Sequence, residues 1–375
     1  MTTTPGRPTL ATWMQPPGNR WAFRHVREII PTARVRRGHT SRELPPSPRP
    51  ELHELLRGGE PLGGYLAASH TDALVVLHRG NLALEWYGDG VEPDDRHILM
   101  SVTKSITGLL AGALARSGRL DLAEPVARYV PAAVGSCFEH ATVRELLDMR
   151  ISTAFVEDYS PGPDVRAYRA STGWYPGAAD GPGLHRYLAG IGPAGPHGGP
   201  FHYVSPCTDM LGWVCERAAG QPYAEALSEL VWAPLGAESD AEVTVDRLGA
   251  ARAAGGLCAT ARDVARLGLV VMRDGDGVLP EAFVEDLWEA GDAAAWAAGD
   301  YAHLLPGGAY RSLWYRARSG ELLAIGIHGQ LILVDRAREV VVVKQSSWPI
   351  AADDPADVAA IEWCQTIAER LASAG

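Results

Sequence analysis

Ser101 and Lys104 have the residue types and the spacing of a serine nucleophile and its lysine base. They stand three residues apart where a helical pattern begins that runs to Arg116, so both side chains are expected on one face of a helix. A serine hydroxyl is a poor nucleophile until an adjacent base accepts its proton, and a neighbouring amine can be that base. The helix N-terminus adds positive potential, which lowers the pKa of the lysine and favours a developing oxyanion. The pair therefore predicts an acyl-enzyme on Ser101.

Lysine is rare in this chain. Of the 34 basic residues only Lys104 and Lys344 are lysines, and all the others are arginines. A guanidinium keeps its proton in a protein, whereas a desolvated lysine can release it, so Lys104 is expected where arginine would fail. Lys344 follows the valines at 341–343 on a predicted strand and is expected to point outward with a structural role. The spacing of Ser101 and Lys104 alone equally fits an N-capping serine followed by an exposed lysine.

Two distant segments could complete this chemistry. Tyr203 stands 102 residues after Ser101, just before another helical pattern, and a tyrosine beside a cationic lysine can pass a proton to a leaving group. Near the C-terminus, Gly326 interrupts a strand pattern and would let a substrate approach the backbone. The backbone N–H of Ile327 could then form an oxyanion hole with that of Ser101. His328 follows, and is expected either to support this strand through a hydrogen bond or to be purely structural.

Strand patterns lie near both ends of the chain, and helical patterns lie between them. Capping residues at Thr142 and Thr260, each followed three residues later by an acidic residue, predict two helix starts. Residues 153–200 combine many Gly and Pro with Tyr and Trp, which predicts a long ordered loop lining a binding site. The periodicity predicts a β-hairpin over 72–87, helices over 101–116, 208–219, 223–231, 260–273 and 355–372, and strands over 310–316, 322–334 and 339–345.

This order of elements predicts an α+β fold, in which an antiparallel sheet flanked by helices carries an inserted helical domain. Residues 1–100 and 250–375 are expected to form the sheet domain. Residues 101–249 are expected to form a mostly helical domain, with the active site at the interface between the two.

Composition argues against several other classes of protein. The net charge of −11 disfavours nucleic acid and anionic membranes as partners, and no apolar run approaches the length of a membrane span. The five cysteines show no paired spacing, and no signal-like segment opens the chain, so a cytoplasmic location is expected. The twelve histidines form no metal-binding motif, and no Gly-x-Ser-x-Gly elbow occurs. No metal or cofactor is therefore expected.

The segments at Ser101–Lys104, Tyr203–Ser205 and Gly326 together resemble the three sequence boxes of penicillin-recognising serine enzymes, the β-lactamases and penicillin-binding proteins. Longer strings narrow the resemblance to the 6-aminohexanoate-dimer (nylon-oligomer) hydrolases and their carboxylesterase relatives, which are similar to class C β-lactamases. These strings cover almost the whole chain and include residues 17–23, 93–101, 157–159, 173–174, 258–263, 326–330 and 346–349.

The resemblance implies a β-lactamase-like fold and roles for particular residues. Ser101, Lys104 and Tyr203 would be the catalytic triad, and the backbone N–H groups of Ser101 and Ile327 would form the oxyanion hole. Tyr159 would be able to hydrogen-bond the scissile amide or ester. The residues expected around the substrate are Tyr159, Arg169, Trp174, Ala254, Trp314, Tyr315 and His328.

Three positions depart from the family pattern. Arg169 stands where nylon-dimer hydrolases carry an aspartate suited to the ammonium group of the substrate, and Ala254 stands where an asparagine can precede the Gly pair. Ala324 stands where β-lactamases carry a lysine that binds a carboxylate. These departures predict an anionic or neutral substrate rather than the nylon dimer or a β-lactam. Ester hydrolysis remains compatible with these departures, because an ester requires the fewest specific contacts from the pocket.

Three functions remain open at this point. In the first, water releases the acyl group of a small ester or amide from Ser101. In the second, an amine or alcohol accepts that group, which would make the protein a biosynthetic transacylase. In the third, the fold is kept as a catalytically silent binding protein, although the intact Ser101, Lys104 and Tyr203 favour an enzyme. The expected partner is a small molecule, and a homodimer is compatible with the sequence.

Overall fold

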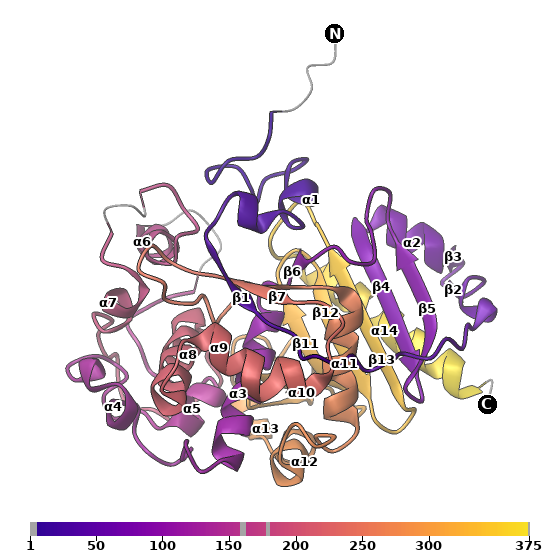
Figure 1. Cartoon of the computed structure of the whole chain (residues 1–375). Coiled ribbons are helices and arrows are strands. Elements are labelled where there is room, and N and C mark those ends of the chain that lie inside the picture. The colour runs from indigo at the N-terminus through magenta and orange to yellow at the C-terminus, as the bar shows by residue number, and fades with distance from the viewer. Residues whose placement is uncertain (1–5, 158–162, 178–180, 374–375) are drawn as a thin grey trace.

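The main sheet is antiparallel and has seven strands. The computed structural model describes residues 6–157, 163–177 and 181–373. The strand order is β5-β4-β13-β12-β11-β10-β9, so strands from both ends of the chain form one sheet (Figure 1). Its strands are β4 (Thr71–His78), β5 (Asn81–Tyr87), β9 (Ala309–Arg311), β10 (Trp314–Arg316), β11 (Leu322–Gly326), β12 (Gln330–Asp335) and β13 (Val340–Ser346).

The strand predictions are confirmed, with corrections at two turns. The 72–87 hairpin and the C-terminal meander both form, because alternating apolar side chains and short turns favour neighbouring antiparallel pairs. The predicted strand over 310–316 is in fact two strands, which turn at Ser312 and Leu313 with φ of 48° and 67°. The predicted strand over 322–334 likewise turns at His328 and Gly329. A side chain at Gly329 would collide with Trp348, so this turn requires glycine.

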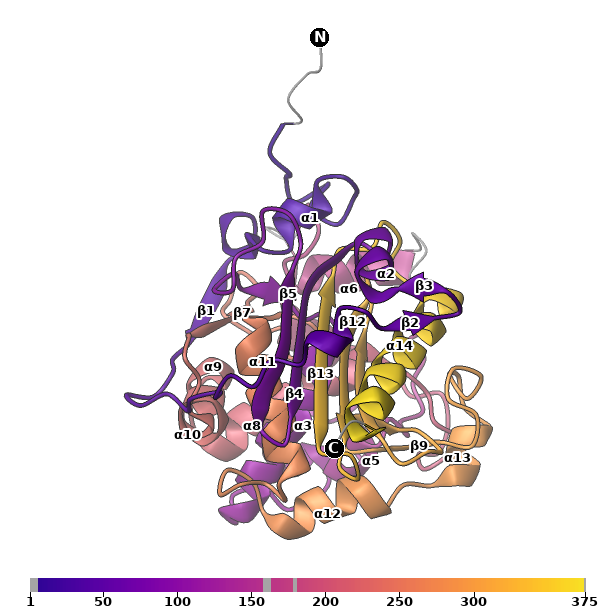
Figure 2. The same cartoon turned by 90° about the vertical axis from the view of Figure 1, so that its right-hand side faces the viewer.

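Helices cover both faces of the main sheet. Figure 2 shows α14 lying across one face, while α3 and α11 lie against the other. The longer helices are α3 (Val102–Arg116), α8 (Ser205–Ala219), α11 (Ala261–Met272) and α14 (Asp354–Ser373). The shorter ones are α1 (Asn19–Ala22), α2 (Leu62–Ala68), α4 (Val126–Tyr129), α5 (Val143–Leu147), α6 (Pro163–Ser171), α7 (Leu184–Leu188), α9 (Tyr223–Leu227), α10 (Ala233–Leu235), α12 (Glu281–Glu289) and α13 (Ala293–Ala297).

The predicted helix starts are confirmed where a capping side chain specifies them. Thr142 forms a complete capping box with Glu145 at α5, and Thr260 caps α11 by accepting from Asp263 N. The helix predicted from Thr208 begins three residues earlier, at Ser205, with a proline in its first turn. The segment 153–200 is less irregular than predicted, because it contains α6 and α7.

A second, four-stranded sheet was not predicted. Its order is β1-β7-β8-β6, and it joins segments up to about two hundred residues apart. Its strands are two to four residues long, which is too short to show an alternating pattern in the sequence. This sheet leads directly into the nucleophile segment, because Leu99 N donates to Leu257 O over 2.8 Å. The strands of the two small sheets are β1 (Thr32–Val35), β6 (His97–Ile98), β7 (Ala241–Thr244) and β8 (Leu257–Ala259), with β2 (Leu56–Arg57) and β3 (Glu60–Pro61) forming a separate pair.

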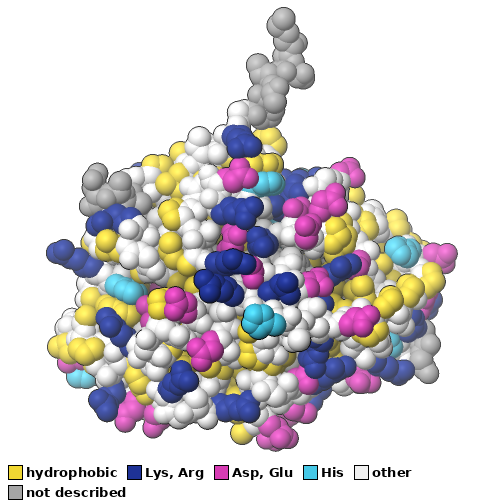
Figure 3. Space-filling view, viewed as in Figure 1, with side chains coloured by type: hydrophobic (Ala, Val, Ile, Leu, Met, Phe, Trp, Pro, Cys, Tyr) yellow, Lys and Arg dark blue, Asp and Glu magenta, His cyan; other side chains and the backbone are white. Residues whose placement is uncertain are grey.

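Both lysines are buried. Lys104 is 2% and Lys344 1% exposed, so the dark blue side chains in Figure 3 are arginines. The prediction that Lys344 points outward is wrong: β13 is a central strand covered on both faces, and no side of it meets solvent. The Lys344 ammonium instead donates to Ser346 Oγ over 2.5 Å, and burial lowers its pKa to about 8.

The division of the chain into two domains at residues 100 and 250 stays a prediction. All described strands of the main sheet lie outside 101–249, and α3 to α10 lie inside it. Among the described helices, none is long and apolar enough to cross a membrane.

Candidate active site

The turn from β6 into α3 presents Ser101 at the start of the helix. Met100 has a positive φ of 46°, and Ser101 is the N-cap residue of α3. Strand β11 approaches this turn very closely, since a Cβ on Gly326 would lie 2.9 Å from Leu99 O and 3.0 Å from Ser101 N. Gly326 therefore allows strand β11 itself to pack against the Ser101 turn. The sequence analysis had instead expected this glycine to let a substrate approach the backbone.

Two backbone N–H groups beside Ser101 are available for an oxyanion. Within the described part of the chain, the N–H groups of Ser101 and Ile327 donate to no protein acceptor. Ile327 follows Gly326 at the end of β11 and lines the same cavities as Ser101. This is the arrangement that an oxyanion hole needs, because the donors must be free to bind the charge that develops on the substrate oxygen.

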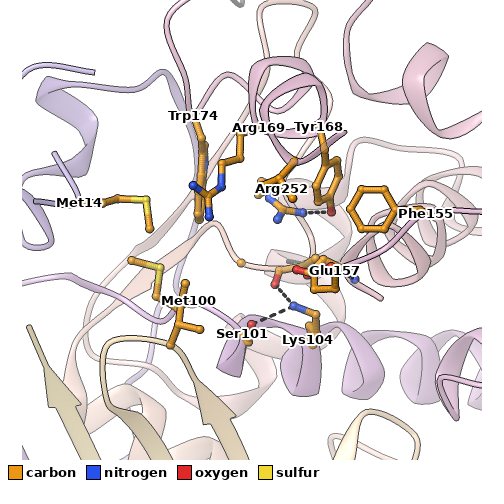
Figure 4. Close-up of a pocket in the computed structure, with 15 residues that line it drawn as sticks. Met14, Met100, Ser101, Lys104, Phe155, Glu157, Tyr168, Arg169, Trp174 and Arg252 are labelled. Atoms are coloured by element: carbon orange, nitrogen blue, oxygen red, sulfur yellow. Dashed lines mark hydrogen bonds between the residues drawn. The ribbon is translucent and has the colours of Figure 1, made fainter. Parts of the chain in front are cut away.

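The Lys104 ammonium is held against the nucleophile. Its Nζ donates to Ser101 Oγ over 3.0 Å and to Ala254 O over 2.7 Å (Figure 4), and it lies 4.9 Å from the ring centroid of Tyr203. Burial lowers the pKa of Lys104 to about 7; Arg252 also lowers it, whereas Glu157 raises it. A lysine with this pKa is largely able to accept a proton near neutral pH.

Tyr203 lies beside both Ser101 and Lys104. It precedes α8, is 4% exposed, and its backbone N–H donates to Asp300 Oδ2 over 2.8 Å. Burial, followed by the charge of Glu157, raises the pKa of the phenol well above its usual value, although a hydrogen bond with Ser101 opposes the shift. The phenol therefore stays protonated at neutral pH, so it can donate its proton to a leaving atom.

Glu157 belongs to the site but was not predicted. Its carboxylate accepts from Ser205 N over 2.8 Å and from Ser205 Oγ over 2.9 Å, so it anchors the start of α8 just after Tyr203. It also lines the same cavity as Lys104. Its only sequence signal was its place in a string shared with the resembling family, because a lone glutamate in a loop has no periodicity.

A buried charge network behind the lysine was also not predicted. Asp209 accepts from Arg252 and, over 2.6 Å, from the Tyr168 hydroxyl, while its other oxygen accepts from Ala254 N over 2.8 Å. Arg252 is 7% and Asp209 1% exposed, and the Arg252 guanidinium lies 4.5 Å from the centroid of the Tyr168 ring. The network fixes the backbone of Ala254, whose carbonyl in turn holds Lys104.

The first cavity opens above Ser101 and is partly open to solvent. The structure places three of the predicted substrate residues in it. Two are Trp174 and Arg169, which is partly buried (Figure 4), and the third is Ala254. Trp174 is fixed by a 2.9 Å hydrogen bond from its Nε1 to Thr244 Oγ1. The residues lining this cavity are Met14, Met100, Ser101, Lys104, Phe155, Glu157, Val165, Tyr168, Arg169, Trp174, Ser205, Arg252, Ala254, Gly255 and Ile327.

A second cavity opens on the other side of the serine, between β11 and the start of α14. It contains Tyr203 and another predicted residue, Tyr315. Ser101 and Ile327 line both cavities, so the nucleophile lies where the two meet. The residues lining the second cavity are Ser101, Tyr203, Tyr301, Leu304, Tyr315, Ile325, Gly326, Ile327, Ala352, Asp354 and Asp357.

Two predicted residues lie in neither cavity. Side chains alternate along β10, so Trp314 points away from the face on which Tyr315 lines the second cavity. His328 is 2% exposed; its Nδ1 lies 2.7 Å from Trp348 O and its ring packs 5.0 Å from Phe23. Burial lowers the pKa of His328 to about 4, which leaves it neutral and structural. The remaining predicted residue, Tyr159, lies outside the described residues.

No metal site accompanies this arrangement in the described ranges. Within 6–157, 163–177 and 181–373, no group of three or more His, Cys, Asp or Glu side chains could hold a metal ion. The five cysteines are free and buried, so they pack as small apolar residues.

A serine beside a buried lysine, a protonated tyrosine and two free N–H groups is the constellation of a penicillin-recognising serine hydrolase. The sequence model of the Beta-lactamase family matches residues 63–362, and the chain belongs to this family. The protein is therefore a serine hydrolase, and the predicted α+β, β-lactamase-like fold is confirmed.

Two relatives show how similar the chain is to other proteins in sequence. It is 39% identical over 356 residues to a 6-aminohexanoate-dimer hydrolase from Paenarthrobacter ureafaciens, which covers 92% of this chain and 89% of the relative. It is 26% identical over 177 residues to a β-lactamase from Pseudomonas fluorescens, covering 44% and 43% of the two chains.

Solved structures extend the comparison. A Bacillus anthracis protein described as a putative 6-aminohexanoate-dimer hydrolase superposes with a TM-score of 0.88, at 26% identity over 99% of both chains. EstCE1, described as a hydrolase with promiscuous acyltransferase activity, superposes with a TM-score of 0.64 at 16% identity, covering 80% of this chain and 96% of its own. The second likeness shows a shared fold alone.

Proposed function

We propose that the protein hydrolyses a small ester or amide through an acyl-enzyme on Ser101, as a carboxylesterase or an amidase similar to the 6-aminohexanoate-dimer hydrolases. The observation that carries this proposal is the buried Lys104 amine, which lies 3.0 Å from Ser101 Oγ and has a pKa of about 7. A buried amine with this pKa is expected where an enzyme needs a general base at neutral pH.

The mechanism follows from the positions of these groups. Lys104 accepts the Ser101 proton while Oγ attacks the carbonyl carbon, and the N–H groups of Ser101 and Ile327 bind the oxyanion. Tyr203 donates its proton to the leaving oxygen or nitrogen and regains one from Lys104. Water then attacks the acyl-enzyme with the help of the same pair and releases the acid. No metal or cofactor takes part in these steps.

The first cavity is the proposed site of the acyl group. Arg169 and Arg252 line it, and Glu157 is the one carboxylate among the described lining residues. Ala254 has only a methyl group where family members can carry an asparagine, so its side chain offers the substrate no hydrogen bond. The two arginines in the lining favour a neutral or anionic acyl group over a cationic one. A cytoplasmic location and a dimeric assembly stay predictions.

Labelling of Ser101 tests this proposal. A fluorophosphonate and p-nitrophenyl butyrate should each modify the wild-type protein by one acyl or phosphonyl group, located on Ser101 by peptide mass spectrometry. The Ser101→Ala variant should take up no label and should lose at least about 10³-fold in ester turnover. Turnover that survives in Ser101→Ala would refute the mechanism, and the absence of any label in the wild-type protein would favour a silent binding protein.

The same assay separates hydrolysis from acyl transfer. With p-nitrophenyl butyrate and a set of amine and alcohol acceptors, we expect free butyrate as the main product. If most acyl groups instead appear as a new amide or ester, the protein is a transacylase, and hydrolysis would be its side reaction.

The pH dependence of turnover reports the state of Lys104. Since only the neutral amine accepts a proton, kcat/KM for a neutral ester should rise with pH and level off above the lysine pKa of about 7. Stopped-flow or steady-state rates, corrected with Ser101→Ala for spontaneous hydrolysis, would measure the profile. A rate that is constant across this range, or that falls with rising pH, would contradict the assignment of Lys104 as base.

A further inference from the structure

The two cavities that meet at Ser101 differ in their charged side chains. The first contains Lys104, Arg169 and Arg252 with a single carboxylate, that of Glu157, whereas the second contains the carboxylates of Asp354 and Asp357 and no described basic residue. A substrate whose scissile bond lies at Ser101 must place one part in each cavity. The charged side chains of each cavity therefore select only the part of the substrate that lies in that cavity.

The position of Tyr203 decides which part of the substrate enters the second cavity. Tyr203 lines the second cavity and is absent from the lining of the first. In the proposed mechanism its phenol protonates the leaving oxygen or nitrogen, and a general acid must lie within hydrogen-bond distance of that atom. The leaving group therefore occupies the second cavity, and the acyl group occupies the first.

The walls of the second cavity are aromatic. Tyr301 and Tyr203 pack edge to face with ring centroids 5.3 Å apart, and Tyr315 completes this wall. Tyr315 is only 7% exposed, yet its hydroxyl forms no hydrogen bond within the described part of the chain. Because this hydroxyl is not fully enclosed by protein atoms, a ligand in the cavity can contact it. The faces of such rings attract cations.

The carboxylates lie at the beginning of α14. Asp357 is partly buried and makes no side-chain hydrogen bond or ion pair with the described residues, while exposed Asp354 pairs with exposed His303 over 2.9 Å. Burial raises the pKa of Asp357 to about 7, and Asp354 and Asp353 add to the shift. Only Lys344, buried in β13, opposes it. One lysine and one exposed histidine thus face three carboxylates, and a bound cation would relieve this excess negative charge.

We propose that the second cavity binds a cationic leaving group, so that the preferred substrate is an ester or amide whose alcohol or amine part carries an ammonium group. This inference rests on the proposed function. In the reaction, the bond from the carbonyl carbon to Ser101 Oγ forms and the bond to the leaving atom breaks. The serine proton reaches that atom through Lys104 and Tyr203. Water then adds across the acyl–serine bond to give the acid and restore the serine.

Two isosteric esters test this proposal. Butyrylcholine and 3,3-dimethylbutyl butyrate share their acyl group and shape, and differ in a quaternary nitrogen against a quaternary carbon. The wild-type protein should show a kcat/KM roughly tenfold higher for the choline ester. The Asp354→Asn/Asp357→Asn double variant should bring this ratio close to one. Tetramethylammonium chloride should also inhibit wild-type hydrolysis of the neutral ester competitively, beyond the effect of equal sodium chloride.

Control variants separate a subsite from a general charge effect. Glu362→Gln removes a carboxylate from the same helix, where Glu362 pairs with Arg57 at the surface, and should keep the ratio unchanged. If the double variant does not fold, each single variant should lower the ratio in part. A wild-type ratio at or below one, or a ratio that the aspartate variants do not change, would overturn the proposal. If neither ester acylates Ser101, the proposed function itself has failed.

Discussion

Replacement of Lys104 by arginine should lower kcat/KM for ester hydrolysis roughly 10³-fold. Lys104 Nζ lies 3.0 Å from Ser101 Oγ, and burial brings its pKa to about 7, so it can accept the serine proton near neutral pH. A guanidinium stays protonated under these conditions and cannot act as a base. The measurement is the burst of p-nitrophenol release together with the mass of the acylated protein, because both report the acylation step.

The other lysine of the chain is the matched control for this substitution. Lys344→Arg makes the same change at a second buried site, where the ammonium contacts Ser346 rather than Ser101. It should keep most of the turnover of a neutral ester, even if it lowers stability. Equal losses in the two variants would show that a disrupted fold, not a missing base, explains the effect of Lys104→Arg.

Replacement of Asp209 by alanine should lower the free energy of unfolding by about 3–5 kcal/mol. Asp209 compensates the charge of buried Arg252, and without it the guanidinium would remain in the protein interior with an unmatched charge. The same substitution removes the acceptor for Ala254 N, so the Ala254 carbonyl would no longer hold Lys104 in place. Urea unfolding followed by circular dichroism measures the first effect, and ester turnover on the remaining folded protein measures the second.

Two comparisons make this second prediction specific. Glu362→Ala breaks an exposed ion pair with Arg57 and should cost less than about 1 kcal/mol, since solvent screens such pairs. Asp209→Asn keeps an oxygen acceptor for Ala254 N and should lose less turnover than Asp209→Ala. If Asp209→Ala were no more destabilising than Glu362→Ala, the buried network would contribute little to the fold.

Local relations in this protein were determined by the sequence alone. Ser101 and Lys104 face each other because residues three apart share a helix face, which holds wherever the helix lies. The capping box at Thr142 forms within one turn, and the hairpin and the meander follow from alternation and short turns. Each of these features depends on neighbours within a few residues, so their pattern is visible in the chain.

Relations across the chain were decided only by the tertiary structure. The pKa of Lys104 depends on burial and on Glu157 and Arg252, which stand 53 and 148 residues away in sequence. Alternation places Trp314 and Tyr315 on opposite faces, but only the packing of β10 in the sheet shows which of the two meets the cavity. Lys344 was predicted to point outward because a sequence pattern cannot reveal that both faces of its strand are covered.

The Ser101–Lys104 pair itself shows where the two contributions meet. Its spacing predicts a nucleophile and a base, yet the same spacing would place both side chains in solvent on an exposed helix. The carbonyl of Ala254, the ring of Tyr203 and the approach of Gly326 come from segments about one hundred to more than two hundred residues further along the chain. Burial by these segments removes water from the lysine, and this desolvation lowers its pKa to about 7, which the proposed role as a base requires.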